Sequence, residues 1–350
     1  QNNVQGASDA GLIPMMYPDY QLVENEKNKN FFEKFWNTKL DEKKGLTVVE
    51  IMNAIHNKQI KGMYILGENP AMSDPDLNHA REALQKLDHL IVQDIFLTET
   101  ATYADVILPA SAWPEKNGTV TNTNRQVQMG RKAIEAPGLA KEDWWITNEI
   151  GKRLGLPWSY NHPKDIYNEM ALTMPSLNNI TWDRLIKENS VTYPCKSPKL
   201  PGDEIVFGDK FPTTSGKAKF VKTEVTNPDE LPDDDFSMIL TTGRQLEHWH
   251  TGAMTRKASN LDAIEPEPSV SLSPSDIITN NLKPGDMIKV STRRGSIQIR
   301  VRQDSGIPNG VLFIPFCYNE AAANLLTNSA LDPYGKIPEF KYCAARIEQV

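Results

Sequence analysis

Residues 61–109 read KGMYILGENPAMSDPDLNHAREALQKLDHLIVQDIFLTETATYADVILP, and this stretch decides the fold class of the first part of the chain. Three short apolar runs within it, Met63–Leu66, Leu90–Val92 and Val106–Leu108, predict buried strands. A helical pattern lies between the first two runs. Because strands that alternate with helices are typical of a parallel α/β sheet, we expect an α/β domain here.

Two helices are marked by their ends and by the spacing of their apolar residues. The first is predicted from about Ser73, which can act as N-cap, with Pro75 in the first turn. Its buried face is predicted to consist of Leu77, Ala80, Leu84 and Leu87. The second is predicted from about Asp143 to the helix breakers Gly155 and Pro157, with Ile146, Ile150 and Leu154 on its apolar face. Both apolar faces are expected to be core.

From Phe236 onward the sequence changes to short strands separated by turn residues. The predicted strands are 238–242, 287–292, 296–301 and 311–314, with Arg293–Gly295 as a hairpin connection. Several short strands of this kind favour a β-barrel. Residues 161–233 are rich in Pro, Asn and Lys and have weak periodicity. We therefore expect an α/β domain over residues 1–160, a connecting region over 161–233, and a barrel domain over 234–350.

The composition is that of a globular protein long enough to bury two cores. The 350 residues are 39% hydrophobic and 24% charged, and no apolar run approaches the roughly 18 residues that a membrane span needs. A net charge of −7 argues against a nucleic-acid partner, because nucleic-acid binding requires a concentrated basic face. We expect neither a membrane span nor a nucleic-acid interface.

Cysteine and histidine usage bounds the metal chemistry of this segment. The three cysteines, Cys195, Cys317 and Cys343, have no C-x-x-C spacing, so no iron–sulfur or zinc site is predicted within the segment. An odd and sparse set favours a reducing compartment, and we expect a cytoplasmic protein with buried, unreactive thiols. Three histidines of the first half, His56, His79 and His89, lie in helix-like or turn contexts without pairing partners. They are interpreted as structural or exposed.

Polar residues follow two of the predicted strands. In a parallel α/β sheet, ligands bind beyond the carboxyl ends of the strands. Gly67 permits close backbone approach, Glu68 and Asn69 present polar groups, and Asp94 follows the next strand. The carboxylate of Asp94 can accept from the N1–H and N2–H edge of guanine, although a lone Asp after a strand is also common as a turn residue or helix cap. Together these loops predict a nucleotide site.

Residues 242–255, TGRQLEHWHTGAMT, gather hydrogen-bond donors behind a predicted strand. The guanidinium of Arg244 can bind a phosphate through two hydrogen bonds, and the imidazoles of His248 and His250 and the hydroxyl of Thr251 add neutral donors. The segment therefore predicts a loop that holds a large anionic ligand. The alternative interpretation is an ordinary polar loop around Trp249.

Seven ordered blocks of the sequence resemble the molybdopterin-guanine-dinucleotide oxidoreductases, and within them the catalytic subunit of formate dehydrogenase. The blocks are QNNVQG (1–6), GENP (67–70), QDIF (93–96), TETA with ADVILP (98–109), WPEKNG (113–118), the Arg244 loop, and FKYCA (340–344). The match runs nearly end to end. This resemblance implies that the predicted barrel is a six-stranded double-psi β-barrel that encloses part of the cofactor.

The resemblance also implies which residues contact the cofactor. In the first part of the chain they are Gln1, Gly67, Glu68, Asn69, Gln93, Asp94, Lys116 and Asp143. In the barrel domain they are Thr242, Gly243, Arg244, Gln245, Leu246, Glu247, His248, Trp249, His250, Thr251, Phe316, Asn324 and Lys341. Two of these have competing structural roles, because Asp143 suits a helix N-terminus and Phe316 suits the core. No residue of this chain is expected to be catalytic or to bind the metal.

The resemblance implies that the enzyme oxidises formate to CO2 at a molybdenum or tungsten ion held by bis(molybdopterin guanine dinucleotide). Since Gln1 is not an initiator Met, the chain is interpreted as the C-terminal half of a longer subunit, inactive alone. The N-terminal half would then carry the metal thiolate ligand and a 4Fe-4S cluster. Iron–sulfur or NAD-linked electron-transfer subunits are the expected partners. The alternatives are a fragment of a nitrate reductase catalytic subunit and a non-catalytic nucleotide-binding module.

Overall fold

The computed structural model describes residues 3–350, so the predicted contact of Gln1 lies outside the described residues. The chain forms two compact units, each built from two stretches of sequence. Unit 1 comprises the residues up to Leu46 together with Pro109–Thr223, and unit 2 comprises Thr47–Leu108 together with Glu224–Val350. The units thus divide the chain differently from the predicted sequence domains, because the β3–β5 segment groups with the barrel.

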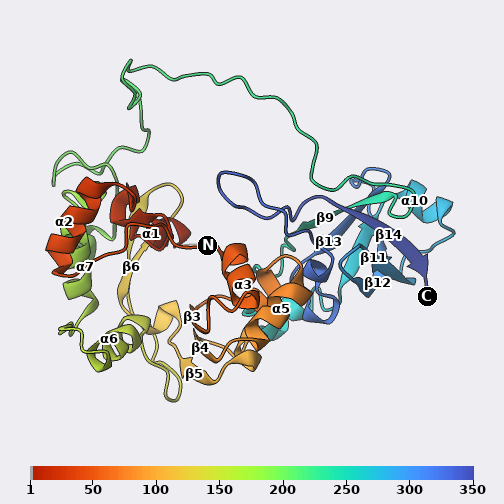
Figure 1. The fold of residues 1–350 in the computed structure, drawn as a ribbon, viewed down its shortest axis with the longest axis horizontal. Coiled ribbons are helices and arrows are strands. Elements are labelled where there is room, and N and C mark those ends of the chain that lie inside the picture. The colour runs from red at the N-terminus through yellow and green to blue at the C-terminus, as the bar shows by residue number, and fades with distance from the viewer. Residues whose placement is uncertain (1–2) are drawn as a thin grey trace. The chain divides into compact units, whose positions relative to one another are not determined.

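The first part of unit 2 is a small parallel α/β layer (Figure 1). Its sheet has the order β3-β4-β5, where β3 is Gly62–Leu66, β4 is His89–Asp94 and β5 is Val106–Pro109, and β3 runs parallel to β4. Helices α3 (Val48–His56) and α5 (Leu77–Gln85) pack with it around a common core. Buried members of that core include Met52, Ile55, Ile65, Leu84, Leu90 and Val92. The predicted α/β sheet and its three strands are confirmed.

The predicted helix start at Ser73 is wrong. Ser73 instead ends a short helix, α4 (Pro70–Ser73), and α5 begins only at Leu77. The cause is Pro75, whose ring keeps the preceding Asp74 out of the helical region, at ψ 149°. The helix restarts after Asp76, which has a left-handed φ of 44°. The predicted buried face is nevertheless present, since Leu77, Ala80 and Leu84 are all buried.

The second part of unit 2 is a closed barrel of six strands. In order around the barrel they are β10 (Ser269–Leu272), β12 (Ser296–Gln303), β11 (Met287–Ser291), β14 (Cys343–Gln349), β9 (Met238–Gly243) and β13 (Val311–Pro315). The pairs β10–β12 and β9–β13 are parallel, and β11–β12 is the predicted antiparallel hairpin. The predicted six-stranded barrel is confirmed. Two of its strands, β10 and β14, were not predicted from the sequence.

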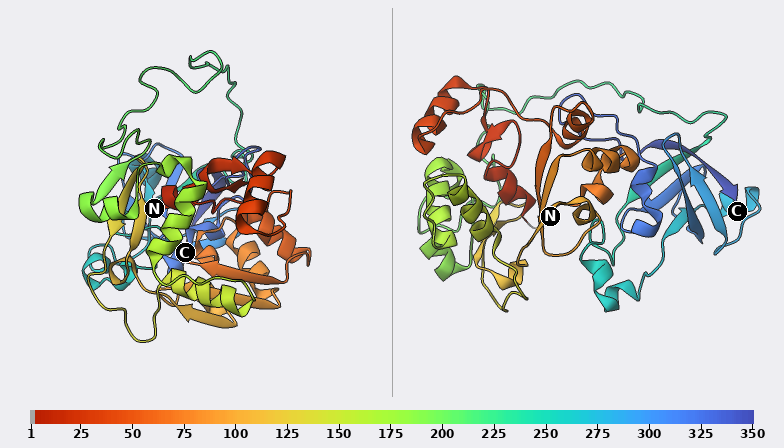
Figure 2. Two further views of the ribbon diagram at one scale, coloured as in Figure 1. Left: turned by 90° about the vertical axis from the view of Figure 1, so that its left-hand side faces the viewer. Right: turned by 60° about the horizontal axis from the view of Figure 1, so that its bottom comes forward.

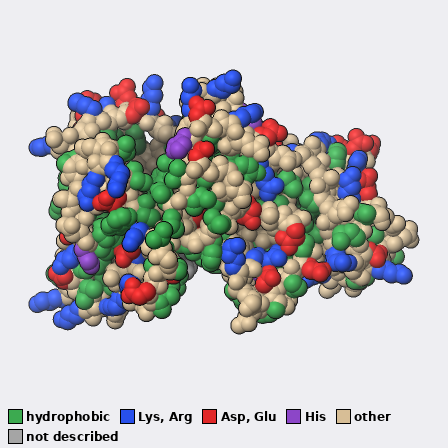
Figure 3. All heavy atoms as spheres, turned by 90° about the horizontal axis from the view of Figure 1, so that it is seen from below, with side chains coloured by type: hydrophobic (Ala, Val, Ile, Leu, Met, Phe, Trp, Pro, Cys, Tyr) green, Lys and Arg blue, Asp and Glu red, His purple; other side chains and the backbone are tan. Residues whose placement is uncertain are grey.

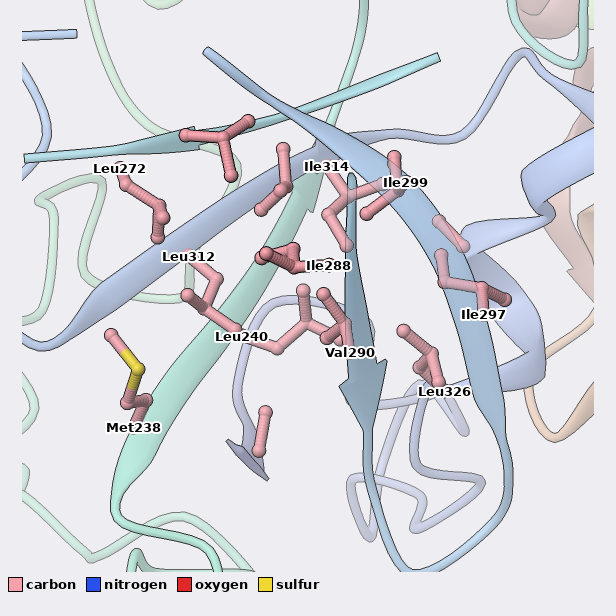
Figure 4. Packing of buried hydrophobic residues seen from close by; sticks show 14 of the residues in the cluster. Met238, Leu240, Leu272, Ile288, Val290, Ile297, Ile299, Leu312, Ile314 and Leu326 are labelled. Atoms are coloured by element: carbon pink, nitrogen blue, oxygen red, sulfur yellow. The ribbon is translucent and has the colours of Figure 1, made fainter. Parts of the chain in front are cut away.

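Alternation of buried and exposed residues along the strands fills the barrel. In β12, Ile297, Ile299 and Val301 are buried whereas their neighbours are exposed, which is the period of two that a strand requires. Figure 4 shows Ile297 and Ile299 in one cluster with Leu240, Ile288 and others from the remaining strands, and Val301 belongs to the same cluster. Two short helices, α9 (Ser259–Asp262) and α10 (Pro274–Thr279), lie between β9 and β11 in the sequence. A closed barrel has no exposed edge strand, so it is a stable support for the loops at its rim.

Unit 1 is built mainly of helices around a three-stranded antiparallel sheet. The sheet has the order β6 (Gly118–Thr121), β7 (Gln126–Gly130) and β8 (Ser190–Thr192). The helices are α1 (Val4–Asp9), α2 (Glu26–Trp36), α6 (Asp143–Arg153), α7 (Pro163–Thr173) and α8 (Trp182–Glu188), and the short strands β1 (Met16–Tyr17) and β2 (Gln21–Leu22) pair with each other. The core of this unit includes Val127, Tyr167, Trp182 and Leu185.

Two sequence expectations for unit 1 need correction. Residues 163–192, predicted to connect two domains, form α7, α8 and β8 and contribute to the core. Pro163 does not interrupt a helix, because it occupies the first turn of α7, where no N–H is needed. Helix α6 does begin at Asp143, but Leu154 lies beyond its last turn and is 75% exposed. Leu154 is therefore not part of the buried face.

The remainder of the predicted connecting region, residues 193–233, forms no helix or strand (Figures 1 and 2). Among the described residues, no helix is long and apolar enough to cross a membrane. The face drawn in Figure 3 carries Lys and Arg side chains interspersed with Asp and Glu side chains. The three cysteines are free and buried, as predicted, and burial raises the pKa of Cys317 to about 12 and that of Cys343 to about 11.

Candidate cofactor-binding site

The loop that leaves β9 starts at a position that only glycine can occupy. A Cβ atom on Gly243 would lie 2.3 Å from a ring carbon of Phe313 on the neighbouring strand. The carbonyl of Gly243 accepts a hydrogen bond of 3.2 Å from the backbone N–H of Phe316. The chain thus turns out of the barrel close to the end of β13, which brings the Arg244 loop beside Phe316.

His248 fixes the conformation of this loop. The side chain is only 2% exposed, and its Nε2 lies 2.8 Å from the carbonyl oxygen of Glu265. Its ring also packs edge-on against Tyr318 at 5.6 Å. The hydroxyl of Thr255 accepts a hydrogen bond of 2.9 Å from the N–H of Trp249. His248 therefore anchors the loop to residues outside it, and the Trp249–Thr255 hydrogen bond holds the loop's own turn.

His250 adopts a left-handed φ of 51°, which aims its side chain into a cavity of unit 2. Its ring contacts Phe316 edge-on at 5.4 Å. Burial lowers the pKa of His250 below its ordinary value, and the positive charge of Arg244 lowers it further. At neutral pH the imidazole is therefore uncharged, and it can donate one hydrogen bond and accept another.

This cavity has a volume of about 520 Å³. Its lining residues are Ser73, Thr242, Arg244, His250, Phe316, Asn324, Phe340 and Lys341. None of these eight is acidic, whereas two of them carry permanent positive charge. The ammonium of Lys341 donates to the carbonyl of Thr242, and burial, together with Arg244, lowers its pKa. The electrostatic potential in the cavity is therefore positive, which favours an anionic ligand.

One wall of the cavity comes from the α/β part of unit 2. The side-chain amide of Asn324, which is 4% exposed, donates 2.9 Å and 3.0 Å hydrogen bonds to the carbonyl oxygens of Met72 and Ser73. Those carbonyls end α4, where backbone acceptors lack partners within the helix. Asn324 therefore joins α4 to the barrel at the position where Ser73 lines the cavity.

A second cavity of about 160 Å³ is lined by Thr251, the residue that follows His250. Its other walls include Thr98 and Glu99 from the loop after β4, and Arg256, Lys257 and Cys317 from the barrel part. Arg256 pairs with Asp262 and Glu320 and lies over the Tyr318 ring at 4.7 Å. The two cavities are therefore lined by consecutive residues of one loop, His250 and Thr251.

The loops after β3 and β4 are tied to each other. Gly67, at a φ of 63°, donates a 2.9 Å hydrogen bond to the carbonyl of Gln93. The side chain of Asn69 donates to Glu99 at 2.8 Å, and its oxygen accepts from the hydroxyl of Thr100 at 2.7 Å. Asn69 therefore positions Glu99, which lines the smaller cavity.

The remaining strand-end candidates differ in accessibility. Gln93 is fully buried and accepts a hydrogen bond from the hydroxyl of Tyr64. Asp94 is partly buried and accepts a 2.6 Å hydrogen bond from the N–H of Ile95, as a turn residue does. Burial raises the pKa of Glu68. The side chains of Asp94 and Glu68 remain accessible to a ligand in part, whereas Gln93 is fully buried and its backbone carbonyl accepts from the N–H of Gly67.

The two candidates in unit 1 contact each other. Lys116 forms an ion pair with Asp143 at the start of α6 and donates a 3.0 Å hydrogen bond to the carbonyl of Ser111. Both predicted roles of Asp143, helix N-terminus and polar contact, are thus compatible with its position. Their role as cofactor contacts stays a prediction.

Within the Arg244 loop, some predicted contacts point away from the cavities. Leu246 is 96% exposed, and the amide of Gln245 donates to Glu247 at 3.0 Å. Trp249 is also exposed. Of the loop residues, Thr242, Arg244 and His250 line the larger cavity, and Thr251 lines the smaller one.

The histidines of the first half have partners that were not predicted. His56 and His79 stack with their ring centroids 4.0 Å apart, and Nε2 of His56 lies 2.9 Å from the carbonyl oxygen of His79. His89 lies 3.7 Å from Asp105. The expectation that these histidines lack partners is wrong, because residues 23 positions apart on α3 and α5 meet only when the helices pack.

Sequence reasoning also missed cavity residues. Ser73 and Phe340 line the larger cavity, and Thr98 and Glu99 line the smaller one. Ser73 was interpreted as a helix N-cap. Thr98, Glu99 and Phe340 belong to the sequence blocks that carry the family resemblance, which was the signal available for them.

Comparison with known proteins agrees with this arrangement. Residues 2–153 match the family model described as "Molybdopterin oxidoreductase", and residues 238–344 match the model described as "Molydopterin dinucleotide binding domain". The acetylene hydratase of Pelobacter acetylenicus has a similar structure, with a TM-score of 0.71 over 92% of this chain and 50% of that one. At 18% identity this likeness concerns the fold alone.

Curated relatives match the whole chain. The F420-dependent formate dehydrogenase subunit alpha of Methanocaldococcus jannaschii is 46% identical over 352 residues, which cover 100% of this chain and 52% of the relative. The assimilatory nitrate reductase catalytic subunit of Bacillus subtilis is 35% identical over 358 residues, covering 99% of this chain and 50% of that protein. The chain spans about half the length of both relatives. Two family models and these relatives thus agree that the chain contains a molybdopterin oxidoreductase domain and a molybdopterin dinucleotide binding domain.

Proposed function

We propose that the two cavities of unit 2 bind one molybdopterin guanine dinucleotide. The observation that carries the proposal is the larger cavity, about 520 Å³, which holds Arg244 and Lys341 and has no acidic residue in its lining. The mutual repulsion of these cations is relieved when an anion lies between them, and a pyrophosphate is such an anion. The family match to a dinucleotide binding domain supports the same ligand.

The donor set fits the chemical parts of this cofactor. Arg244 can hold a phosphate through two parallel hydrogen bonds, and Lys341 adds a point charge. The neutral imidazole of His250 can donate to a phosphate or to a polar ring without adding charge. Phe316 and Phe340 offer apolar surface for a flat heterocycle. Asp94 and Glu68, at the ends of the strands, can accept from the N–H groups of a guanine.

The activity that we propose for the subunit containing this chain is oxidation of formate to CO2, with release of one proton and two electrons. The bound cofactor, with molybdenum or tungsten, would supply the two-electron chemistry, and the residues of this chain would bind and orient it. We infer that the rest of the subunit carries the metal thiolate ligand and a 4Fe-4S cluster. The name of the Methanocaldococcus relative favours F420 over NAD as the final acceptor.

A nitrate reductase remains the second candidate, because the Bacillus subtilis relative of that name matches nearly the whole chain. The sequence QNNVQG at residues 1–6 favours formate dehydrogenase. A non-catalytic nucleotide-binding module is the third candidate, and it describes what the isolated chain would be.

The test uses the full-length subunit that contains this chain. Formate-dependent reduction of viologen and nitrate-dependent oxidation of reduced viologen are measured side by side, together with metal content and released guanosine monophosphate. Formate activity without nitrate activity is expected. Arg244→Ala should lower cofactor content, whereas Met254→Ala, at an exposed position of the same segment, should not. Equal cofactor content in both variants would contradict the assignment of the cavity.

A further inference from the structure

The turn between α4 and α5, Asp74–Asp76, packs against the barrel part of the same unit. The N–H of Asp76 donates to the carbonyl of Thr327 at 3.2 Å. Immediately before the turn, Asn324 holds the carbonyls of Met72 and Ser73. The docked turn therefore keeps Ser73 in the wall of the larger cavity.

The carboxyl group of Asp74 is buried in this docked turn. The residue is 5% exposed, and its Oδ2 is buried with no hydrogen-bond partner among the described residues. Its Oδ1 lies at the long distance of 3.5 Å from the hydroxyl of Ser73. An ionised carboxylate in such a place is strongly disfavoured, because it has lost its hydration without gaining a partner.

Among the described residues, those that line the cavity beside Asp74 include no Lys or Arg. Asp74 lines a small cavity of about 50 Å³ with Asn53 and His79 from the helices and Ser329 from the barrel part. Burial lowers the pKa of His79, and His56, which stacks on it, lowers this pKa further, whereas Asp76 and Glu82 raise it. The Nζ atom of Lys86 lies 2.8 Å from Nδ1 of His56. Burial raises the pKa of Asp74 to about 7, the charge of Glu68 contributes to the rise, and Ser73 opposes it.

We propose that Asp74 holds a proton while the α4–α5 turn is docked on the barrel and releases it when the turn separates. Docking of the turn, and with it the cavity wall formed by Ser73 and Asn324, is thereby linked to pH. This linkage is independent of which ligand the cavity binds.

The direction of the effect follows from the two states of the carboxyl group. In the exposed turn its pKa returns toward the ordinary value near 3.8, whereas in the docked turn it is about 7. Docking is therefore fully favoured below about pH 4 and weakens as the pH rises to about 7. Between these limits the docking equilibrium changes by up to about tenfold per pH unit, and above them it is constant.

Hydrogen–deuterium exchange of the 350-residue chain from pH 4.5 to 8 tests this linkage. The measured quantity is the protection of peptides covering residues 70–85 and 319–329, expressed as the ratio of wild type to Asp74→Asn at each pH. Intrinsic exchange rates cancel in this ratio, so its pH dependence reports docking of the turn. We expect the ratio to fall as the pH rises to about 7 and then to level off. Asp88→Asn, at an exposed position before β4, should behave as wild type. A ratio that does not change with pH would overturn the proposal.

A second variant keeps the test decisive if Asp74→Asn does not fold. Glu68→Gln removes the neighbouring negative charge, so Asp74 should ionise at lower pH. Protection of the same peptides, divided by the protection of a barrel-core peptide, should then level off at a lower pH than in wild type. An unchanged pH dependence would also overturn the proposal.

Discussion

The side chain of Asn324 offers a test of how the α/β part of unit 2 is held to the barrel. Asn324→Ala removes both hydrogen bonds that its amide donates to the end of α4. A typical hydrogen bond contributes about 1 kcal/mol net, and a buried acceptor left unpaired costs about 1 to 3 kcal/mol. The two carbonyls belong to consecutive residues and can share a water that enters the vacated space. We therefore expect α4 and α5 to lose about 2 to 3 kcal/mol of protection.

Hydrogen exchange resolved by peptide measures this loss. Two kcal/mol corresponds to a roughly 30-fold faster exchange of α5 amides, since 1.4 kcal/mol is a factor of ten. The strands of the barrel core should change much less, because opening of the turn is local. Asn309→Ala is the matched control, because Asn309 is exposed in the turn before β13. Its effect should stay within about 0.5 kcal/mol.

The result that would refute this reasoning is specific. If exchange of α5 in Asn324→Ala is accelerated less than about threefold, Asn324 does not fasten α4, and another contact holds the cavity wall. If barrel and α5 amides accelerate equally, the two parts of unit 2 unfold together, and the assignment of a local junction fails.

Four further predictions follow from particular residues. Asp94→Ala in the full-length subunit should reduce pterin content with little change in the thermal midpoint of the apo form; the reverse pattern would make Asp94 a structural turn residue. Gly151→Ala should lower the melting temperature by overpacking worth about 1 to 3 kcal/mol, because the new Cβ would lie 2.2 Å from the Trp158 ring, whereas Gly118→Ala, with open space around it, should be tolerated far better. Ellman's reagent at pH 8 should label none of the three cysteines in the folded chain and all three in urea, since they are buried and the pKa values of Cys317 and Cys343 are raised. The 350-residue chain alone should show no formate-dependent viologen reduction, and any turnover would contradict its interpretation as a cofactor-binding part.

The fold class was predictable where one local rule dominated. Apolar runs such as Leu90–Val92 and the alternation in residues 296–301 identified strands because burial imposes a period or a continuous run. The strand β14 was missed because its sequence, CAARIEQ, begins with three small or weakly strand-forming residues that are buried only by the closure of the barrel. The helices within residues 163–192 were missed because the segment was interpreted from its Pro, Asn and Lys content and its weak periodicity, although Pro163 lies where a helix tolerates proline.

The cavity residues were predictable only in part, for a related reason. Arg244, His250 and Lys341 were predicted by the family resemblance, and the structure brings all three to one cavity. Ser73 was not predicted as a cavity residue, because its place depends on Asn324, some 250 residues later in the chain. A single sequence holds no signal for such a contact. The same holds for the stacking of His56 on His79, which arises from helix packing.

Asn324 and Asp74 act on the same wall of the larger cavity, with opposite consequences. Asn324 supplies the donors that the end of α4 lacks, so it favours docking at every pH. Asp74 places a carboxyl group without a partner in the same junction, so it opposes docking whenever it is ionised. The proposed ligand is long and highly charged, so a cavity wall that can open would ease its entry. The double variant Asn324→Ala with Asp74→Asn should therefore regain part of the protection that Asn324→Ala loses at pH 7.5 and almost none of it near pH 3, where Asp74 is largely protonated in both the docked and the separated turn. Equal behaviour at the two pH values would mean that these residues do not act on one junction.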